Sequence, residues 1–436
     1  MKPTAQFLIA APHSGAGKTT VTLGLLRALR RKGQVVQPFK CGPDFIDPIH
    51  HGAAAGRDSI NLDRFMMSDD HIRRLYAAYT RDAGVAVVEG VMGLFDGAVK
   101  SEGSAADLAK LLDLPVILVL NAKAMAYSAA AILYGLRQFD PGVRIAGALF
   151  NFVETESHYR ILREAAADAG VPSLGYLPTD TRLYIPSRHL GLDTAVSEKA
   201  IEAAADHLEK QLDLDEWLRL TPGEGPVETL PSPTLAREPS ARRTILIARD
   251  AAFHFLYPEN IRRLEALGAV SYFSPLEDAG FAAKPDLIYL PGGYPELHLS
   301  RLSANRSLLD RLRGYASAGG KLLAECGGMM YLGRSIVDEN GGSWPMAGIL
   351  DLTTGMQEQR LQLGYRTLHL PGGLAKGHEF HYSRVLGELK GKGFKAYTAR
   401  GEVVETAAFR TSGILASYMH FYWGEDAGFL ESWLDS

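Results

Sequence analysis

"QFLIAAPHSGAGKTTVTLGLLRALRRKG" (residues 6–33) is the stretch that decides the fold of the first half of the chain. It opens with a short apolar run that predicts a buried strand, and apolar side chains recur at helical spacing between Lys18 and Gly33. A glycine-containing loop joins the two. A strand, such a loop and a helix in this order are typical of a phosphate-binding loop, in which backbone N–H groups at the helix N-terminus hold phosphate oxygens.

The loop departs from the usual pattern, GxxxxGK[ST], because Pro12 stands where the first glycine belongs. The alternative is a glycine turn before a surface lysine. We favour nucleotide binding because the loop directly follows the first strand, and we therefore predict a site for ATP and Mg²⁺. Lys18 would place its charge between the β- and γ-phosphates, and the Thr19 hydroxyl would bind Mg²⁺. The residues expected to contact the nucleotide are Ser14, Gly15, Ala16, Gly17, Lys18, Thr19 and Thr20.

Further apolar runs in the first half are separated by segments of helix length. They lie at residues 35–40, 85–90, 115–120 and 144–151. This alternation is typical of a doubly wound parallel sheet, so we predict an α/β domain of the P-loop NTPase type at residues 1–220. A segment rich in Pro, Glu, Ser and Thr then predicts a linker at residues 221–243.

A second strand–helix series follows the linker. Strands are expected at residues 244–250, 269–275, 286–293 and 321–325, with a helix at 259–268 and a strand at the start of 413–423. The pattern predicts a second doubly wound α/β domain at residues 244–436. The whole chain is therefore expected to be α/β, with two domains.

Composition limits the kinds of partner. The 436 residues are 46% apolar and 22% charged, and the formal net charge of −4 argues against nucleic acid as a partner. We expect no membrane span, because apolar stretches of about 20 residues are lacking. Cys41 and Cys326 are too far apart in sequence for a CxxC or zinc motif. We therefore expect a reducing, cytoplasmic location.

Two stretches could carry acidic ligands at strand ends. "VVEGVMGLFDG" (87–97) places Glu89 where a strand ends and ligands bind in open α/β sheets. A solvated carboxylate is the alternative, but the neighbouring glycines favour a loop that faces a ligand. "FKCGPDFIDPIHH" (39–51) gathers Lys40, Asp44 and Asp47, and one of the two aspartates could be structural because Asp-Pro is a common turn element.

"KLLAECGGMMYLG" (321–333) allows three interpretations of Cys326: a buried filler, half of a redox pair, or a nucleophile. An apolar strand that ends at Glu325 and a helix that starts just after Cys326 resemble the nucleophile elbow G-x-C-x-G, with Ala324 in place of the first glycine. The helix N-terminus would stabilise a thiolate. The distance from Cys41 argues against a redox pair.

A nucleophilic thiol also needs an oxyanion hole and a base. Gly292 and Gly293, in "YLPGGYPELH" (289–298), could offer backbone N–H groups to an oxyanion, and His420 could serve as the base. Each feature alone is as typical of packing as of catalysis. The ordered set of a Gly-Gly loop, a Cys elbow and a late histidine favours a nucleophilic site.

These motifs resemble known families over essentially the whole chain outside the linker. The second half resembles class I glutamine amidotransferase domains of the cobyric-acid-synthase type, through "AECGGMMYLG", "GHEFHYS" (377–383) and "SYMHFYW" (417–423). The first half resembles the dethiobiotin-synthetase-like ATPases. Together with "VQPFKCGPDFIDP" (36–48), the combination resembles the cobyrinate a,c-diamide synthase family. The fold that this implies is a P-loop NTPase-like domain followed by a flavodoxin-like amidotransferase domain.

The resemblance implies ATP- and glutamine-dependent amidation of the a and c acetate groups of cobyrinic acid in cobalamin biosynthesis. The implied substrates are a tetrapyrrole acid and L-glutamine, and a homodimer is possible. By resemblance, Cys326 is the glutaminase nucleophile and His420 its base. The remaining assignments are Lys40 and Asp44 to the substrate, Thr19, Asp47 and Glu89 to Mg²⁺, and Asn151 to adenine.

One departure and two alternatives remain. Many amidotransferases carry a Glu two residues after the catalytic His, and Tyr422 stands there, so Glu379 is a candidate for orienting His420. The acceptor could instead be sirohaem, nickel-sirohydrochlorin or hydrogenobyrinate. A partitioning-type ATPase with a degenerate second domain is another possibility, but the intact Cys326 and His420 argue against it.

Overall fold

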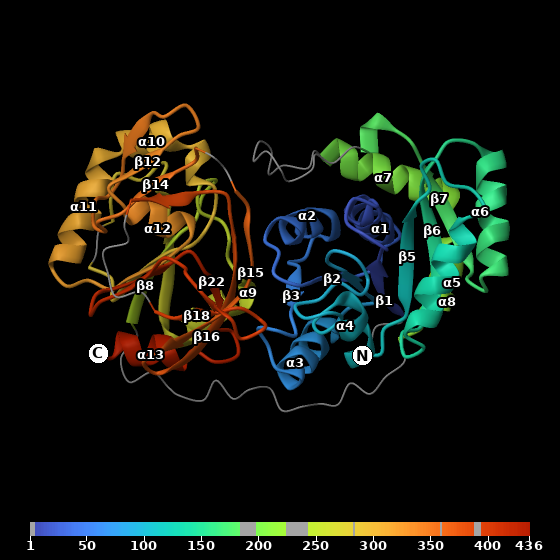
Figure 1. Cartoon of the computed structure of the whole chain (residues 1–436), viewed down its shortest axis with the longest axis horizontal. Helices are drawn as coiled ribbons and strands as arrows, with labels where there is room; N and C mark the ends of the chain where they lie inside the picture. The colour runs from blue at the N-terminus through green and yellow to red at the C-terminus, as the bar shows by residue number, and fades with distance from the viewer. Residues whose placement is uncertain (1–4, 184–197, 224–242, 282–283, 358–359, 388–393) are drawn as a thin grey trace. The chain divides into compact units, whose positions relative to one another are not determined.

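The computed structural model describes residues 5–183, 198–223, 243–281, 284–357, 360–387 and 394–436. The chain divides into two compact units, Met1–Pro233 and Thr234–Ser436 (Figure 1). Most of the expected linker lies outside the described residues. Among the described residues, no helix is both long enough and apolar enough to cross a bilayer.

The described part of the first unit contains a seven-stranded parallel sheet in the order β3-β2-β4-β1-β5-β6-β7 (Figure 1). This confirms the predicted parallel α/β fold. After β1 the chain turns to β2 on one side, whereas β5 lies on the other, so the end of β1 is a switch point at which ligands bind. The strands are β1 (Ala5–Ala10), β2 (Val36–Cys41), β3 (Ile60–Leu62), β4 (Val85–Glu89), β5 (Val116–Asn121), β6 (Ile145–Val153) and β7 (Ser173–Pro178).

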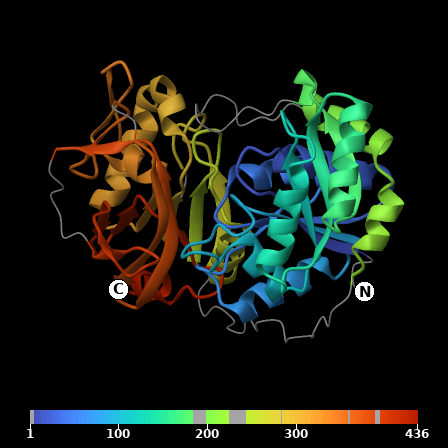
Figure 2. The same cartoon turned by 45° about the vertical axis from the view of Figure 1, so that its right-hand side comes forward.

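Helices cover this sheet and complete its core. On α1, Gly24 lies against Ala204 and Leu208 of α7, and α5 lies beside α6 (Figure 2). Trp217 of α8 packs on Phe7 of β1, with ring centroids 5.8 Å apart. The helices are α1 (Lys18–Arg31), α2 (Ile46–Ala55), α3 (Asp69–Thr80), α4 (Ala105–Leu111), α5 (Ala129–Phe139), α6 (Glu156–Asp168), the 3₁₀ turn η1 (Thr181–Leu183), α7 (Glu198–Gln211) and α8 (Leu214–Leu220).

The end of the first unit runs past α8. The Gln6 N–H donates to the Thr221 carbonyl at 2.9 Å, and Pro222 forms an isolated bridge with Ala5. Thr221 is fully buried. These two residues, which the predicted linker included, therefore pack with β1.

Within its described residues, the second unit is built on a six-stranded sheet in the order β20-β21-β11-β10-β8-β9. All neighbours pair in parallel except β20 and β21. Numbered along the chain, the five parallel strands have the flavodoxin-like order 2-1-3-4-5, as predicted. The strands are β8 (Arg243–Ala248), β9 (Gly268–Phe273), β10 (Leu287–Leu290), β11 (Leu322–Glu325), β20 (Ala408–Arg410) and β21 (Ile414–Ser417).

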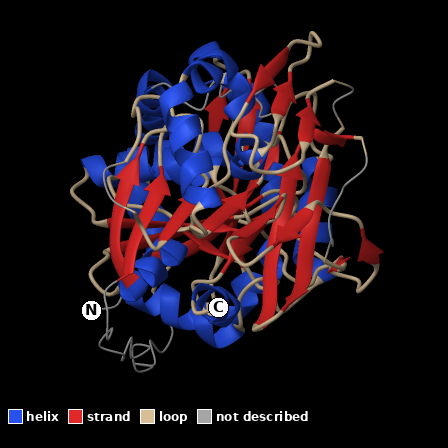
Figure 3. Ribbon diagram, turned by 90° about the vertical axis from the view of Figure 1, so that its left-hand side faces the viewer, coloured by secondary structure: helices blue, strands red, loops and turns tan. Residues whose placement is uncertain are grey.

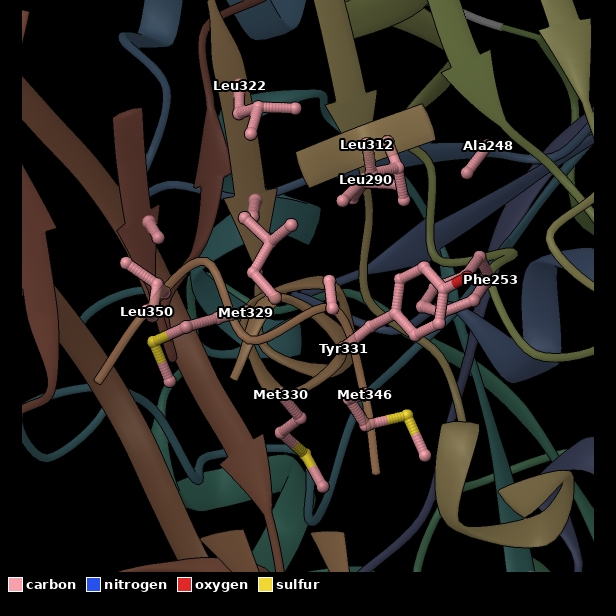
Figure 4. Close-up of a cluster of buried hydrophobic side chains, with 14 of the residues drawn as sticks. Ala248, Phe253, Leu290, Leu312, Leu322, Met329, Met330, Tyr331, Met346 and Leu350 are labelled. Atoms are coloured by element: carbon pink, nitrogen blue, oxygen red, sulfur yellow. The ribbon is translucent and has the colours of Figure 1, made fainter. Parts of the chain in front are cut away.

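The helices of the second unit cover this sheet, and one of them starts at the thiol. Figure 4 shows Leu322 on β11 and, beyond it, Met329, Met330 and Tyr331 of α12 in one apolar cluster. The apolar face of α12 therefore anchors the segment that follows Cys326. The helices are α9 (Pro258–Leu267), the 3₁₀ turn η3 (Pro295–Leu297), α10 (Leu299–Ala304), α11 (Arg306–Ser317), α12 (Gly327–Leu332) and α13 (Gly428–Leu434).

Two further sheets in this unit were not predicted. Their described strands follow the orders β13-β12-β14-β17 and β19-β18-β15-β16-β22, and most neighbours are antiparallel. Figure 3 draws all described strands of the chain in red. Several strands of these two sheets are only two or three residues long, too short to show a period. The strands are β12 (Ser335–Val337), β13 (Ser343–Pro345), β14 (Thr353–Gly355), β15 (Gln362–Leu370), β16 (Gly373–His381), β17 (Arg384–Leu386), β18 (Ala396–Tyr397), β19 (Val403–Val404) and β22 (His420–Tyr422).

Two helical glycines in the first unit make a matched test of packing. A Cβ on Gly24 would lie 2.9 Å from the Ala204 backbone, whereas one on Gly135 of α5 would meet open space. Gly24→Ala should therefore lower the free energy of unfolding by about 1–3 kcal/mol, and Gly135→Ala should raise it by about 0.5–1 kcal/mol. Urea unfolding followed by circular dichroism measures both. Equal midpoints for the two variants would contradict the α1–α7 packing.

Candidate active sites

The phosphate-type loop of the first unit is shaped by two glycines. Gly15 and Gly17 have φ angles of 81° and 94°, the left-handed region that glycine adopts at no steric cost. A Cβ on Gly17 would collide with the side-chain amide of Asn151. The predicted residues are placed as expected: Ser14, Gly15, Ala16 and Gly17 form the loop, and Lys18, Thr19 and Thr20 the first turn of α1.

The side chain of Asn151 supports this loop through a hydrogen bond to its backbone. It lies on β6, is buried, and its Nδ2 donates to the Ala16 carbonyl at 3.1 Å. Its Oδ1 accepts from the Phe152 N–H at 2.9 Å. These contacts hold the loop close to β6, which gives Asn151 a structural task. The adenine contact expected from the family stays a prediction.

The first turn of α1 is bonded to β4 and the loop after it. Lys18 Nζ donates to the Met92 carbonyl at 2.5 Å. The Thr19 hydroxyl donates to Glu89 Oε1 at 2.8 Å. Glu89 is the last residue of β4 and is 1% exposed. The strand-end carboxylate and the loop hydroxyl that the sequence suggested therefore lie together.

Lys40 lies among three carboxylates. At the end of β2, its Nζ donates to Asp47 Oδ2 at 2.6 Å and to Glu89 Oε1 at 3.1 Å, and Asp44 Oδ2 is 3.8 Å away. All four side chains are buried. Asp44 Oδ1 also accepts from the N–H groups of Ile46 and Asp47, at the start of α2. Asp44 thus caps the start of α2, while the assignment of the two aspartates to substrate and Mg²⁺ stays a prediction.

His51 completes this cluster, and the sequence reasoning missed it. Its Nε2 lies 2.6 Å from Glu89 Oε2, its Nδ1 lies 3.0 Å from the Ser59 hydroxyl, and it is fully buried. Burial would raise the pKa of Glu89, but the Lys40 charge and the His51 hydrogen bond lower it below its ordinary value. The four-residue spacing from Asp47 to His51 on a helix was the available signal.

The donor set fits a magnesium ion shared with phosphates. Among the described residues, no three His, Cys, Asp or Glu side chains are arranged to hold a metal alone. Mg²⁺ usually takes one or two protein oxygens beside phosphate oxygens and water, and Thr19 and Glu89 present such oxygens. Asp47, also predicted as a ligand, forms an ion pair with Lys40.

Cys326 of the second unit lies on a strained elbow between β11 and α12. Its φ of 44° and ψ of −105° are sparsely populated for any residue with a Cβ. Its N–H donates to the Ser417 carbonyl at 2.7 Å, which ties the elbow to β21. Gly327 and Gly328 let the elbow approach the end of β10 and the segment after it. A Cβ on Gly327 would lie 2.7 Å from Pro295 Cδ, and one on Gly328 would collide with the Leu290 carbonyl.

The Gly-Gly loop and the late histidine meet at this elbow. A Cβ on Gly292 would collide with the His420 ring. The Gly293 carbonyl lies 3.2 Å from the position of a Cβ on Gly327. The structure therefore places the glycine pair between the His420 ring and the segment that follows Cys326. Their catalytic roles stay predictions.

The electrostatic expectation for the thiol was wrong. Burial, together with the charge of Glu296, raises the pKa of Cys326, which is 4% exposed. Burial, together with His378 and His381, lowers the pKa of His420 well below 6.5. The backbone hydrogen bond of Gly327, at the start of α12, lowers the pKa of Cys326 by less than burial raises it. These directions favour the neutral form of each group, the thiol of Cys326 and the uncharged imidazole of His420.

A second histidine supports His420. His378 of β16 pairs with His420 of β22, and their rings stack with centroids 5.1 Å apart. The Tyr257 hydroxyl lies 3.2 Å from His378 Nδ1. Glu379, the candidate orienter, instead accepts hydrogen bonds from Arg366 Nε at 2.7 Å and from the Thr406 hydroxyl. His378 was visible in "GHEFHYS" but was not assigned a role.

Glu325, next to the thiol, is a buried carboxyl that sequence reasoning missed. Its Oε2 accepts from the Tyr289 hydroxyl at 2.8 Å, and its Oε1 accepts from the Phe421 N–H at 3.1 Å. It is 1% exposed. Burial raises the pKa of Glu325 to about 8, so the carboxyl is mostly protonated at neutral pH.

Comparisons with known proteins give a family for each unit. Residues 7–192 match the CobQ/CobB/MinD/ParA nucleotide binding domain, and residues 244–428 match the CobB/CobQ-like glutamine amidotransferase domain. The chain therefore combines a nucleotide-binding domain with a glutamine amidotransferase domain. It belongs to the family of a,c-diamide synthases, which are glutamine amidotransferase ligases.

Three curated relatives show the family. The hydrogenobyrinate a,c-diamide synthase of Brucella abortus is 44% identical, over 95% of this chain and 97% of its own. The cobyrinate a,c-diamide synthase of Syntrophotalea carbinolica is 39% identical, over 99% and 98%. That of Salmonella typhimurium is 38% identical, over 98% and 97%. The similarity thus extends over both units.

Glu325→Gln should remove a pH dependence of stability. An unfolded Glu ionises near pH 4.5 and the folded one near pH 8, so the folded chain holds this proton more tightly. Stability is therefore lost as the pH rises between these values, by up to about 1.4 kcal/mol per pH unit. Gln cannot titrate, so the urea midpoint of wild type should fall relative to the variant between pH 5 and 8. A constant difference would contradict the raised pKa.

Proposed function

We propose that this chain uses ATP and glutamine to amidate the a and c acetate carboxylates of a corrinoid acid. One observation carries the proposal. One chain carries a phosphate-type loop followed by Thr19, whose hydroxyl donates to Glu89, and an elbow cysteine next to the loop on which the His420 ring packs. Relatives that match this chain over both units are named a,c-diamide synthases. The rest of the proposal follows from what each site can do chemically.

The first unit would activate the acceptor. A carboxylate is a poor acyl donor because its oxygens carry the negative charge, whereas a mixed anhydride with phosphate has a good leaving group. Lys18 would neutralise charge on the transferred phosphate, and Lys40 and Asp44 would hold the acceptor. Bound Mg²⁺, held by Thr19 and Glu89 with Asp47 nearby, would supply further neutralisation of phosphate charge.

The second unit would release ammonia from glutamine. The Cys326 thiol attacks the amide carbon while His420 takes the thiol proton, because the pair is neutral before the reaction. N–H groups of Gly292 and Gly293 would bind the oxyanion. His420 then gives its proton to the departing nitrogen, and water hydrolyses the thioester to glutamate. The product nitrogen is thus released as uncharged NH₃.

Fusion of the two activities in one chain has a chemical reason. Free ammonia at neutral pH is mostly ammonium, which has no lone pair with which to attack the anhydride. Producing ammonia in the protein that holds the anhydride shortens the time in which it can be protonated.

Two acceptors remain to be separated. The sequence motifs predicted cobyrinate, and the relatives so named are 38–39% identical. The relatives named for hydrogenobyrinate reach 44% identity, which favours the cobalt-free acid as the acceptor. Other tetrapyrrole acids serve as controls.

The homodimer and the cytoplasmic location stay predictions. The outer face of α5 would suit a homodimer, because Tyr134 and Phe139 are 57% and 72% exposed. Sedimentation velocity decides the oligomeric state. Both cysteines are free thiols, which suits a reducing compartment.

The function is tested by offering hydrogenobyrinate, cobyrinate and sirohaem separately with ATP, Mg²⁺ and glutamine. Mass spectrometry of the products should show two successive conversions of a carboxylic acid to a carboxamide with a corrinoid acid. Sirohaem should remain unchanged. Amidation of sirohaem alone would refute the proposed acceptor class, and ATP turnover without glutamine hydrolysis would favour a partitioning-type ATPase.

Cys326→Ala and Lys18→Ala should separate the two units. Cys326→Ala should abolish glutamine-dependent amidation but keep amidation with high ammonium, because only the nitrogen source is lost. Lys18→Ala should lower amidation from either source by at least about 100-fold, because phosphate charge is no longer neutralised. Product formation with each nitrogen source measures both. Loss of ammonium-dependent activity in folded Cys326→Ala would refute the thiol's role.

A further inference from the structure

The buried carboxyl of Glu325 accepts hydrogen bonds from the Tyr289 side chain on β10 and from the Phe421 backbone on β22. We infer that Glu325 is a positioning residue, which fixes His420 and the oxyanion loop relative to Cys326 during glutamine hydrolysis. The inference rests on the proposed function of the second unit and assigns a role to a residue outside the reacting set.

The first link, between Glu325 and the nucleophile Cys326, is the peptide bond that joins the two residues. Glu325 is the last residue of β11, and Cys326 follows it on the strained elbow. β11 pairs with β10 on one side and with β21 on the other, where Glu325 lies opposite Ser417. Since the elbow backbone is fixed by the Cys326–Ser417 hydrogen bond, the Glu325 carboxyl has a fixed place relative to the thiol.

The second link is to the base. Glu325 Oε1 accepts from the N–H of Phe421, the residue after His420. β22 has three residues and pairs with β16 at the edge of its sheet. Asn260 Nδ2 donates to the Phe421 carbonyl at 2.8 Å from the other side. Side chains thus bind both the N–H and the carbonyl of Phe421, and the position of the neighbouring His420 depends on these two hydrogen bonds.

The third link is to the oxyanion loop. Glu325 Oε2 accepts from the hydroxyl of Tyr289, which lies on β10 just before the loop that contains Gly292 and Gly293. Tyr289 is 1% exposed. Without the carboxyl, the Tyr289 hydroxyl and the Phe421 N–H would both lose a buried acceptor, which favours movement of both segments.

Glu325 could take over the orienting role of the carboxylate that is missing as the third member of the Cys326–His420 site. Position 422 carries Tyr rather than a carboxylate, and Glu379 is bonded to Arg366 and Thr406. Glu325 would act on the backbone beside His420 rather than on its ring. A displacement of about 1 Å between reacting groups can cost about 100-fold in rate, so this backbone link is enough to matter.

The test compares Glu325→Leu, Glu325→Gln and Glu325→Asp by steady-state glutamine hydrolysis. Glu325→Leu should lower kcat at least about 30-fold and change KM by less than about threefold, because the geometry of the reacting groups is lost. Glu325→Gln retains an acceptor and a donor and should restore kcat to within about threefold of wild type. Glu325→Asp, which is one methylene shorter, should fall between them.

Two measurements separate positioning from a fold defect. Ammonium-dependent amidation should be unchanged in all three variants. Tyr315→Leu is the matched control, because the Tyr315 hydroxyl donates to Pro285 and Lys321 at the opposite ends of β10 and β11. It removes hydrogen bonds to the residues that lead into the same two strands and should leave kcat within about threefold of wild type.

Several results would overturn the inference. These are a Glu325→Leu kcat within threefold of wild type, an equal loss in Tyr315→Leu, and a Glu325→Gln as slow as Glu325→Leu. If Glu325→Leu does not fold, a wild-type kcat in Glu325→Asp overturns it and a loss at constant KM supports it. A wild-type chain that hydrolyses no glutamine would overturn the proposed function, and this inference with it.

Discussion

Close approach of glycine backbone to a neighbouring side chain or carbonyl, at positions with no room for a Cβ, is the constraint on which both sites depend. Gly17 lies against the Asn151 amide, Gly292 lies against the His420 ring, and Gly328 lies against the Leu290 carbonyl. In each place a loop at the end of a parallel strand is pressed onto a neighbouring element. The chemistry-bearing side chains next to these glycines, Lys18 and Cys326, are thereby fixed by backbone packing.

The two sites solve the problem of buried polar groups in opposite ways. In the first unit the groups are ions that compensate one another, with Lys40 among three carboxylates and Glu89 ionised. In the second unit burial keeps Cys326 and His420 neutral. Preset charges suit a site that stabilises phosphate, since its ligand is charged throughout. Neutral partners suit a thiol that must lose its proton only when a neutral amide arrives.

The sequence predicted those features that are local along the chain. Parallel strands appear as apolar runs because both of their faces are buried, and the loop before Lys18 and the elbow at Cys326 are continuous motifs. The short antiparallel strands and the neutrality of the thiol could not be predicted, because they depend on partners distant in sequence. His51 and Glu325 were missed for the same reason. His51 meets Glu89 across 38 positions, and Glu325 meets Phe421 across 96.

The path from β21 to β22 has a further consequence. The chain leaves the six-stranded sheet at Ser417 and enters the five-stranded sheet at His420, so nucleophile and base belong to different sheets. The distance between them is a property of the interface between two layers and not of either layer. Substitutions in that interface, even far from the thiol, should therefore lower the turnover of the site before they unfold the unit. The activity of such a site depends first on the packing between its two sheets.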